Sequence, residues 1–431
     1  MEKNQQDMSF WLLVSLVSGN MIGSGIFILP SSLANIGSIS ILSWIFTSLG
    51  SMMLALVFCN LSYLVRGEGG PYFYIKKGMG KFIGFQSGIG YWISICVGNS
   101  AMVLVIMNYL NFFFPVMSEK IIMMIVSLFI IWSLSILNYL GLKKIMWIQI
   151  ASIFCKILPL FFIIFVGIWY INPTFYETFN YTNESNFYAF NNAASLTLWA
   201  FIGVETATFV SGKIKNPRKT IPLATLLGTA IAAFVYILSF TIILGIIPHE
   251  QLIECSNPFA LTASIIISDS FGKIVGVLSI LSCIGTLNGW IMISSFISKS
   301  MAKNEILPNT FSKENKYGVP YHGLIVSSIF TTVLIFLTFS ENLIKQFELI
   351  CLMAVFTTLI PYFYVTVSSI ILFKRKMPKM RIYNPYMIIS ILALTYSSWT
   401  IMGLDFHIVY YGTILVFLMA PLYGITKWKN H

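Results

Sequence analysis

The feature that most constrains this chain is the repetition of apolar runs of about twenty residues, such as Ile121–Leu137 and Leu223–Ile247. At ~1.5 Å per residue, a helix of that length crosses the ~30 Å hydrocarbon layer of a membrane. Of the 431 residues, 57% are hydrophobic and 10% are charged, against ~45–50% apolar and ~25% charged in soluble domains. A single soluble core is excluded, and we expect an all-α integral membrane protein.

Twelve candidate spans are found when the apolar runs are read between glycine, proline and charged residues. They lie at residues 10–35, 41–64, 83–113, 121–138, 148–170, 190–210, 221–246, 272–300, 323–340, 347–372, 386–403 and 408–426. The sequence therefore predicts one twelve-helix domain at 10–426, between short cytoplasmic ends at 1–9 and 427–431.

The distribution of charge predicts the orientation of these spans. The formal net charge is +11, from 26 Lys and Arg against 15 Asp and Glu. If the amino terminus is cytoplasmic, three cations lie on the outer side (Lys120, Lys273 and Lys345), Lys156 lies within a span, and the others fall in inner segments. The positive-inside rule then predicts that both termini are cytoplasmic. Because the charge is spread over short loops, nucleic-acid binding is not expected.

The apolar spans contain no motif that is typical of an enzyme active site or a metal site. The four histidines lie in loops or at the terminus: His249, His322, His407 and His431. The sequence contains no His-Glu-x-x-His, Cys-x-x-Cys or Walker-type motif. We expect no catalysis, no cofactor and no metal, which leaves a transporter, a channel or a membrane receptor.

The first span is interrupted by small residues, in the segment Ser18-Gly-Asn-Met-Ile-Gly-Ser-Gly25. A glycine costs about 1 kcal/mol against alanine within a helix. One interpretation is close helix packing, since Gly19 and Gly23 have the Gly-x-x-x-Gly spacing. The other is a helix unwound at mid-membrane, whose freed amides around Ser24 and Gly25 hold a carboxylate.

The sixth span contains a glycine and a carboxylate in the segment Leu198-Trp-Ala-Phe-Ile-Gly-Val-Glu205. An ionisable group at membrane depth costs at least ~2.5–3.5 kcal/mol, so Glu205 is a candidate functional residue. The alternative is that Glu205 lies at a cytoplasmic helix end near Lys213 and Lys215. Glycine-interrupted first and sixth spans indicate a transporter built from two inverted repeats. A channel would need filter loops or rings of charge, which we do not find.

Several motifs resemble the amino acid/polyamine/organocation transporter superfamily, and most closely its basic amino acid antiporters of the arginine/agmatine and lysine/cadaverine type. Besides the two interrupted segments, these motifs are Gly69-Gly-Pro-Tyr72, Tyr91-Trp92 with Gly98-Asn99, Lys215-Asn-Pro-Arg-Lys219, Ile221-Pro-Leu-Ala-Thr225 and Gly285-Thr-Leu-Asn-Gly-Trp290. The resemblance runs through nearly the whole chain. It implies twelve helices, with inverted five-helix repeats at about 10–170 and 190–372, broken first and sixth helices, and two extra helices within 386–426.

The resemblance also implies which residues bind the substrate: Met21, Ser24, Gly25, Asn99, Met102, Trp199, Ile202 and Trp290. Ser24 and Gly25 would hold the substrate carboxylate, and carbonyls near Met21, Trp199 and Ile202 its α-ammonium. Trp199 would stack on the substrate side chain, a cation–π role worth roughly 0.5–2 kcal/mol.

At the far end of the substrate, the resemblance assigns the guanidinium or amine to Asn99 and to the carbonyl region near Met102. Trp290 would wall the pocket on the cytoplasmic side. Tyr91, Glu205 and Tyr362 would form an inner gate.

Two positions depart from the arginine/agmatine pattern. Ala354 aligns with a serine of the arginine exchanger, so one hydroxyl contact to a guanidinium is absent. Lys156 replaces an apolar residue and resembles the fifth-span lysine of proton-coupled amino acid transporters. In that resemblance it braces the unwound first span, whereas the plain alternative is a lysine that snorkels to an interface.

We therefore expect a carrier of the bacterial inner membrane that exchanges a cationic amino acid for its decarboxylated amine, with arginine and agmatine as the first pair. Its partners would be these small molecules and the lipid bilayer, with a homodimer as a candidate assembly. The alternative is proton-coupled amino acid uptake, with Lys156 or Glu205 carrying the proton. A receptor that transports nothing is a distant third.

Overall fold

The computed structural model describes residues 9–65, 70–209, 214, 216–337, 343–377, 384–418, 420–421 and 423–424. Every regular element within these ranges is a helix, which confirms the all-α class. Nine of the helical segments are long and apolar enough to cross a membrane, and the shorter apolar helices Tyr321–Leu337 and Phe406–Phe417 join them. With the broken sixth span described below, the described residues account for the twelve predicted spans.

The helices follow the predicted order along the chain. They are α1 (Phe10–Met21), α2 (Gly25–Ala34), α3 (Ile39–Leu64), α4 (Pro71–Met79), α5 (Lys81–Phe113), α6 (Lys120–Tyr139), α7 (Leu142–Gly167), α8 (Asn186–Trp199), α9 (Thr206–Phe209), α10 (Pro217–Ile246), α11 (His249–Glu254), α12 (Pro258–Ile266), α13 (Asp269–Lys303), α14 (Tyr321–Leu337), α15 (Leu343–Lys376), α16 (Pro385–Met402) and α17 (Phe406–Phe417).

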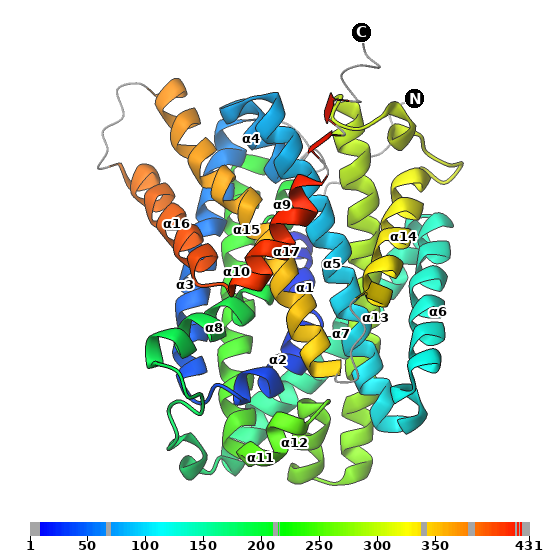
Figure 1. Ribbon diagram of the computed structural model, residues 1–431, viewed down its shortest axis with the longest axis vertical. Helices are drawn as coiled ribbons and strands as arrows, with labels where there is room; N and C mark the ends of the chain where they lie inside the picture. The colour runs from blue at the N-terminus through cyan, green and yellow to red at the C-terminus, as the bar shows by residue number, and fades with distance from the viewer. Residues whose placement is uncertain are drawn as a thin grey trace.

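The long helices run between two ends of the bundle (Figure 1). The short helix α4 lies at one end, and the short helices α11 and α12 lie at the other. We call these the α4 end and the α11 end. Hydropathy did not predict these three short helices, because each has fewer than ten residues and cannot cross the hydrocarbon layer.

Both predicted helix interruptions are present. In the first span, α1 ends at Met21 and α2 begins at Gly25, because the backbone of Ile22 leaves the helical region with ψ 81°. In the sixth span, α8 ends at Trp199 and α9 begins at Thr206. Between them Gly203 has φ +111°, a conformation that favours glycine.

Gly19 and Gly23, which have the Gly-x-x-x-Gly spacing, differ in their surroundings, and this difference tests the packing interpretation. A Cβ added to Gly23 would lie 2.8 Å from the Thr286 side chain of α13, whereas one added to Gly19 would meet nothing within 4 Å. The absence of a side chain at Gly23 therefore permits close packing of the first span against α13. At Gly19 there is room for a side chain. Close packing alone does not explain this segment.

Basic side chains at the α4 end bind backbone carbonyls where helices terminate. Lys376 donates to the Leu64 carbonyl at the end of α3, and Lys76 Nζ donates to the Asn304 carbonyl after α13 at 3.0 Å. The last turn of a helix leaves carbonyls without partners inside the helix, and cations there also oppose the helix dipole. Part of the positive charge at the α4 end therefore stabilises the ends of helices.

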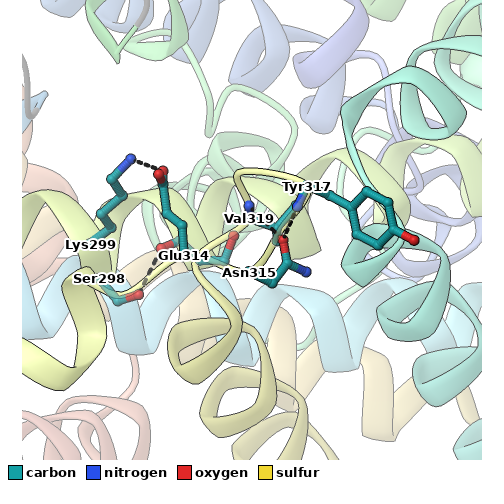
Figure 2. Close-up of polar contacts among 7 residues, drawn as sticks. Ser298, Lys299, Glu314, Asn315, Tyr317 and Val319 are labelled. Carbon is teal, nitrogen blue, oxygen red and sulfur yellow. Dashed lines mark hydrogen bonds and ion pairs between the residues drawn. The ribbon is translucent and has the colours of Figure 1, made fainter.

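The loop between α13 and α14 lies at the α4 end and is held by side chains (Figures 1 and 2). Figure 2 shows Lys299 of α13 paired with Glu314 of the loop. Asn315 Oδ1 accepts from the amides of Tyr317 and Val319 at 2.9 and 3.1 Å. Because the carboxylate of Glu314 is exposed, the ion pair adds little stability, and Asn315 does more to fix the loop.

Candidate substrate site between the broken helices

The two helix interruptions meet at one pocket in the middle of the bundle. Its lining residues come from the first span, α5, the sixth span and α13: Asn20, Met21, Gly23, Ser24, Gly25, Ser94, Ile95, Gly98, Asn99, Met102, Trp199, Ala200, Ile202 and Trp290. All eight residues predicted to bind the substrate are among them. The structure brings these eight residues together, and their roles in binding stay predictions.

The pocket lies between helix ends of opposite polarity. The amino terminus of α2 begins there at Gly25, and the carboxyl terminus of α8 ends there at Trp199. A helix carries about +0.5 charge at its amino terminus and −0.5 at its carboxyl terminus. The arrangement is suited to a molecule with a carboxylate at one point and an ammonium near it.

Two buried polar atoms of the pocket lack partners in the described part of the chain. Ser24 Oγ and Asn99 Oδ1 make no hydrogen bond, although both residues are almost fully buried. A buried polar atom without a partner costs about 1–3 kcal/mol. A ligand that donates to Asn99 and bonds to Ser24 would remove that cost.

Two glycines lie against the indole ring of Trp199. A Cβ added to Gly25 would lie 2.8 Å from Trp199 Cδ1, and one added to Gly98 would lie 2.9 Å from Trp199 Cη2. The two glycines come from α2 and α5, so the ring lies in a slot that any side chain would narrow. Each glycine stands in a sequence motif of its own, but nothing in the sequence showed that both lie against the same tryptophan.

The open part of the pocket is small, about 20 Å³. That volume holds about one water molecule. An amino acid fits only if Trp199 or the surrounding helices move. The structure is therefore a state in which the pocket is closed around its own side chains.

A carboxylate and two tyrosines close the pocket toward the α4 end. Tyr91 donates to Glu205 Oε1, and Tyr362 donates to Glu205 Oε2 at 2.5 Å. Glu205 is fully buried, so these hydroxyls replace the water that the carboxylate loses. The structure brings these three residues together, and their role as a gate stays a prediction. Lys213 and Lys215, the partners in the alternative interpretation, lie outside the described residues.

Trp290 of α13 also lines the pocket. Its Nε1 donates to the carbonyl of Asn20 at 3.4 Å, and the Asn20 side chain donates to Thr206 Oγ1 at the same distance. A Cβ on Gly203 would approach the Trp290 ring to 3.0 Å. The break in the sixth span and the break in the first are thus linked through Trp290 and Asn20.

Lys156 of α7 contacts the other side of the first-span break. It is 3% exposed, and its Nζ donates to the Gly19 carbonyl at 2.5 Å. The snorkelling alternative is wrong for this structure, because the ammonium is buried against the last turn of α1 rather than at an interface. The cation also lies favourably at a helix carboxyl terminus.

A second polar layer separates the tyrosine cluster from the α4 end. Tyr72 of α4 shares a hydrogen bond of 2.8 Å with Ser300 of α13, and Asn304 Nδ2 donates to the Tyr72 hydroxyl at 2.9 Å. Lys76 also binds the Asn304 carbonyl. These contacts hold α4 against the end of α13.

Six lining residues were not among the predicted site residues: Asn20, Gly23, Ser94, Ile95, Gly98 and Ala200. Asn20 stands within the first-span motif and, as a polar residue at membrane depth, could have been selected. Ser94 lies one turn before Gly98 on α5, so helical periodicity was the available signal. Ala200 has no polar side chain, and only the break of the helix brings its backbone to the pocket.

These features define a multi-pass membrane protein whose central pocket is formed by two broken helices. The sequence profile of the amino acid permease family matches residues 8–430. The chain belongs to this family of membrane transporters, within the superfamily that the motifs resemble.

Individual relatives match over most of their length. The chain is 31% identical over 418 residues to the putrescine transporter PotE of Haemophilus influenzae, covering 97% of this chain and 96% of that protein. It is 30% identical over 419 residues to PotE of Escherichia coli K12, covering 96% and 95%. It is 31% identical over 361 residues to the cadaverine/lysine antiporter of Escherichia coli K12, covering 82% and 81%.

Proposed function

We propose that this protein exchanges a cationic amino acid for a decarboxylated amine by alternating access to the central pocket. One observation carries the proposal: an α2 amino terminus, an α8 carboxyl terminus and the face of Trp199 meet in a buried pocket whose lining residues include no charged side chain. Such a pocket offers dipoles, carbonyls and a π surface, which suit an ammonium and a carboxylate carried on one small molecule.

The amino acid would bind with its carboxylate toward Ser24 and Gly25 and its α-ammonium toward the carbonyls at the end of α8. Its side-chain cation would lie over Trp199 and donate to Asn99 Oδ1, which lacks a partner. The amine product lacks the carboxylate and would use only the second set of contacts. We infer a looser fit for the amine at the α2 terminus, which favours its release on exchange.

The relatives support an ammonium rather than a guanidinium as the far group. One is a putrescine transporter and another a cadaverine/lysine antiporter, and Ala354 removes a hydroxyl from the side expected to meet a guanidinium. We keep arginine and agmatine as the pair expected from the resemblance, and we rank a pair with an ammonium end, such as lysine and cadaverine, above it.

We further propose that the α4 end faces the cytoplasm of a bacterial cell and that the chain lies in the inner membrane. The positive-inside rule supports this orientation, because Lys76, Lys299, Arg375 and Lys376 all lie at the α4 end. In that orientation the pocket is closed toward the cytoplasm by Glu205 and by α4. A homodimer remains a proposal for the assembly.

Proton-coupled uptake is the second candidate, and Lys156 favours it. A buried ammonium that touches the first-span break at Gly19 links any change in its charge to the shape of the pocket. In that mechanism Lys156 or Glu205 would carry the proton, and no amine would leave in exchange.

Counterflow into proteoliposomes tests the proposal. Vesicles holding unlabelled lysine, cadaverine, putrescine, arginine, agmatine or leucine are given traces of labelled lysine and, separately, labelled putrescine. We expect accumulation with cationic contents and none with leucine. Counterflow that leucine supports as well as lysine would contradict a cationic substrate, and its absence with every content would contradict exchange.

A further inference from the structure

A second and larger cavity lies at the α11 end, with a volume of about 520 Å³. The helices α2 and α8 line both cavities: Ser32 follows Gly25 by seven residues, and Leu196 precedes Trp199 by three. At 1.5 Å per residue these separations are about 10 and 5 Å. The two cavities are therefore neighbours along α2 and α8.

The charges around this cavity are mostly negative. Glu254 ends α11, Glu348 lies in the first turns of α15, and Asp405 caps α17. Lys345 is the one cation among the lining residues, and it interacts with Glu348. Three carboxylates from three separate elements thus face one ammonium, which leaves an excess of negative charge in a concave surface.

A buried hydroxyl points to a ligand as well. Ser32 is 2% exposed, lines the cavity and lies against Glu348. Its Oγ completes no hydrogen bond of ordinary geometry within the described residues. A group that donates hydrogen bonds to Ser32 and Glu348 together would satisfy both.

The described acids of this cavity do not form a metal-binding cluster. Across the described residues, no three His, Cys, Asp or Glu side chains are close enough to hold a metal ion. Apolar and aromatic side chains line the cavity together with the acids, among them Ile36, Tyr188, Ile253, Leu352 and Leu404. Such walls suit a chain of methylene groups that carries a positive charge at each end.

We propose that this cavity is a second binding site, for an organic dication of the α,ω-diamine type. It would hold the amine on the α11 side before or after passage by Trp199. Its negative potential would raise the local concentration of a cation by a factor of about 10–10³. The choice of an amine rests on the proposed function, whereas the negative potential does not.

The test measures the potential and the occupancy of the cavity without transport. Asn192 lines the cavity, so Asn192→Cys in a Cys255→Ser background provides a reporter thiol, with Tyr188→Cys as a second reporter. The full chain in lipid nanodiscs is labelled with cationic and anionic methanethiosulfonates, with and without putrescine. We expect the cationic reagent to react about tenfold faster than the anionic one, relative to free thiol, and putrescine to slow both.

Charge variants show whether the acids cause these effects. Glu254→Gln with Asp405→Asn should reduce the preference to about twofold or less and remove protection by putrescine. Asparagine at residue 405 keeps the helix cap. The control is Glu250→Gln, because Glu250 lies on the same helix α11 but does not line the cavity; it should behave as the parent does.

Repeating the protection assay in Trp199→Leu separates this proposal from the proposed function. If putrescine still protects the reporters in Trp199→Leu while even the wild type shows no counterflow, the second site is supported and exchange is rejected. Normal counterflow without protection at either reporter would reject the second site. Equal reaction rates for the two reagents would also reject the second site. No labelling at either reporter, or equal protection by Mg²⁺ at the same concentration, would reject it as well.

Discussion

At the scale of single residues, the slot around Trp199 makes the strongest prediction. Gly25→Ala should weaken amino acid binding about tenfold or more, and Gly25→Val should abolish transport, because a Cβ there would lie 2.8 Å from the indole. Gly19→Ala is the matched control, since its Cβ would meet nothing within 4 Å. Calorimetric affinities that are equal for Gly25→Ala and Gly19→Ala would show that the slot does not matter.

Replacement of the tryptophan itself tests the π surface. Trp199→Leu should weaken binding of a cationic substrate by on the order of 1–2 kcal/mol, about tenfold, because the cation–π contact is lost. Trp199→Phe keeps an aromatic face and should lose less. Binding of lysine and putrescine by calorimetry checks both variants, and unchanged affinity in the leucine variant would remove Trp199 from the site.

Tyr362 tests the closure around Glu205. Tyr362→Phe leaves Glu205 Oε2 buried without its donor, which should cost about 1–3 kcal/mol of closed-state stability. We expect a lower melting temperature and faster thiol labelling of a Ser94→Cys reporter by a small reagent from the α4 end. The control is Tyr364→Phe, two residues away. If both variants melt and label as the wild type does, the hydrogen bond is not a gate.

The residues that line the pocket were easier to predict from the sequence than the contacts between them. Glu205 could be selected as a candidate because a carboxylate at membrane depth is energetically costly and usually serves a function. Its bonding to Tyr91 and Tyr362 entered through the resemblance, since those residues are 114 and 157 positions away and no local pattern joins them. The shared slot of Gly25 and Gly98 was not predictable for the same reason.

At the scale of helices, Lys156 ties α7 to the end of α1 through the Gly19 carbonyl. In the exchange account it is a fixed brace, so Lys156→Met should lower amino acid affinity and melting temperature while exchange stays independent of a pH gradient. Lys273→Met, at an exposed position of α13, is the control. A pH gradient that drives wild-type uptake, with that response lost in Lys156→Met, would instead identify Lys156 as the proton carrier.

The helix breaks were predictable and the short helices were not. Glycines and hydroxyls in the middle of an apolar run weaken a helix where membrane helices are otherwise continuous. The helices α4, α11 and α12 depend on packing against longer helices, as the bonds from Tyr72 and Lys76 to α13 and its end illustrate. Hydropathy carries no such information.

At the scale of the whole molecule, the two ends are closed to different degrees. The α4 end has Trp290, the Glu205 cluster and the Tyr72 layer between the pocket and its surface, whereas the α11 end has a cavity of about 520 Å³. Alternating access requires that the closed side open while the other closes. We therefore propose that this structure, with its pocket closed, lies next to the state that opens toward the α11 end.

Trans-stimulation tests whether transport by this protein is an obligatory exchange. Purified protein is reconstituted into vesicles that are empty or hold unlabelled cadaverine, and uptake of labelled lysine is followed with and without an inward proton gradient. The account predicts at least tenfold faster uptake with cadaverine inside, and little effect of the gradient. Uptake into empty vesicles that the proton gradient drives as fast as internal cadaverine does would contradict exchange and favour proton-coupled uptake.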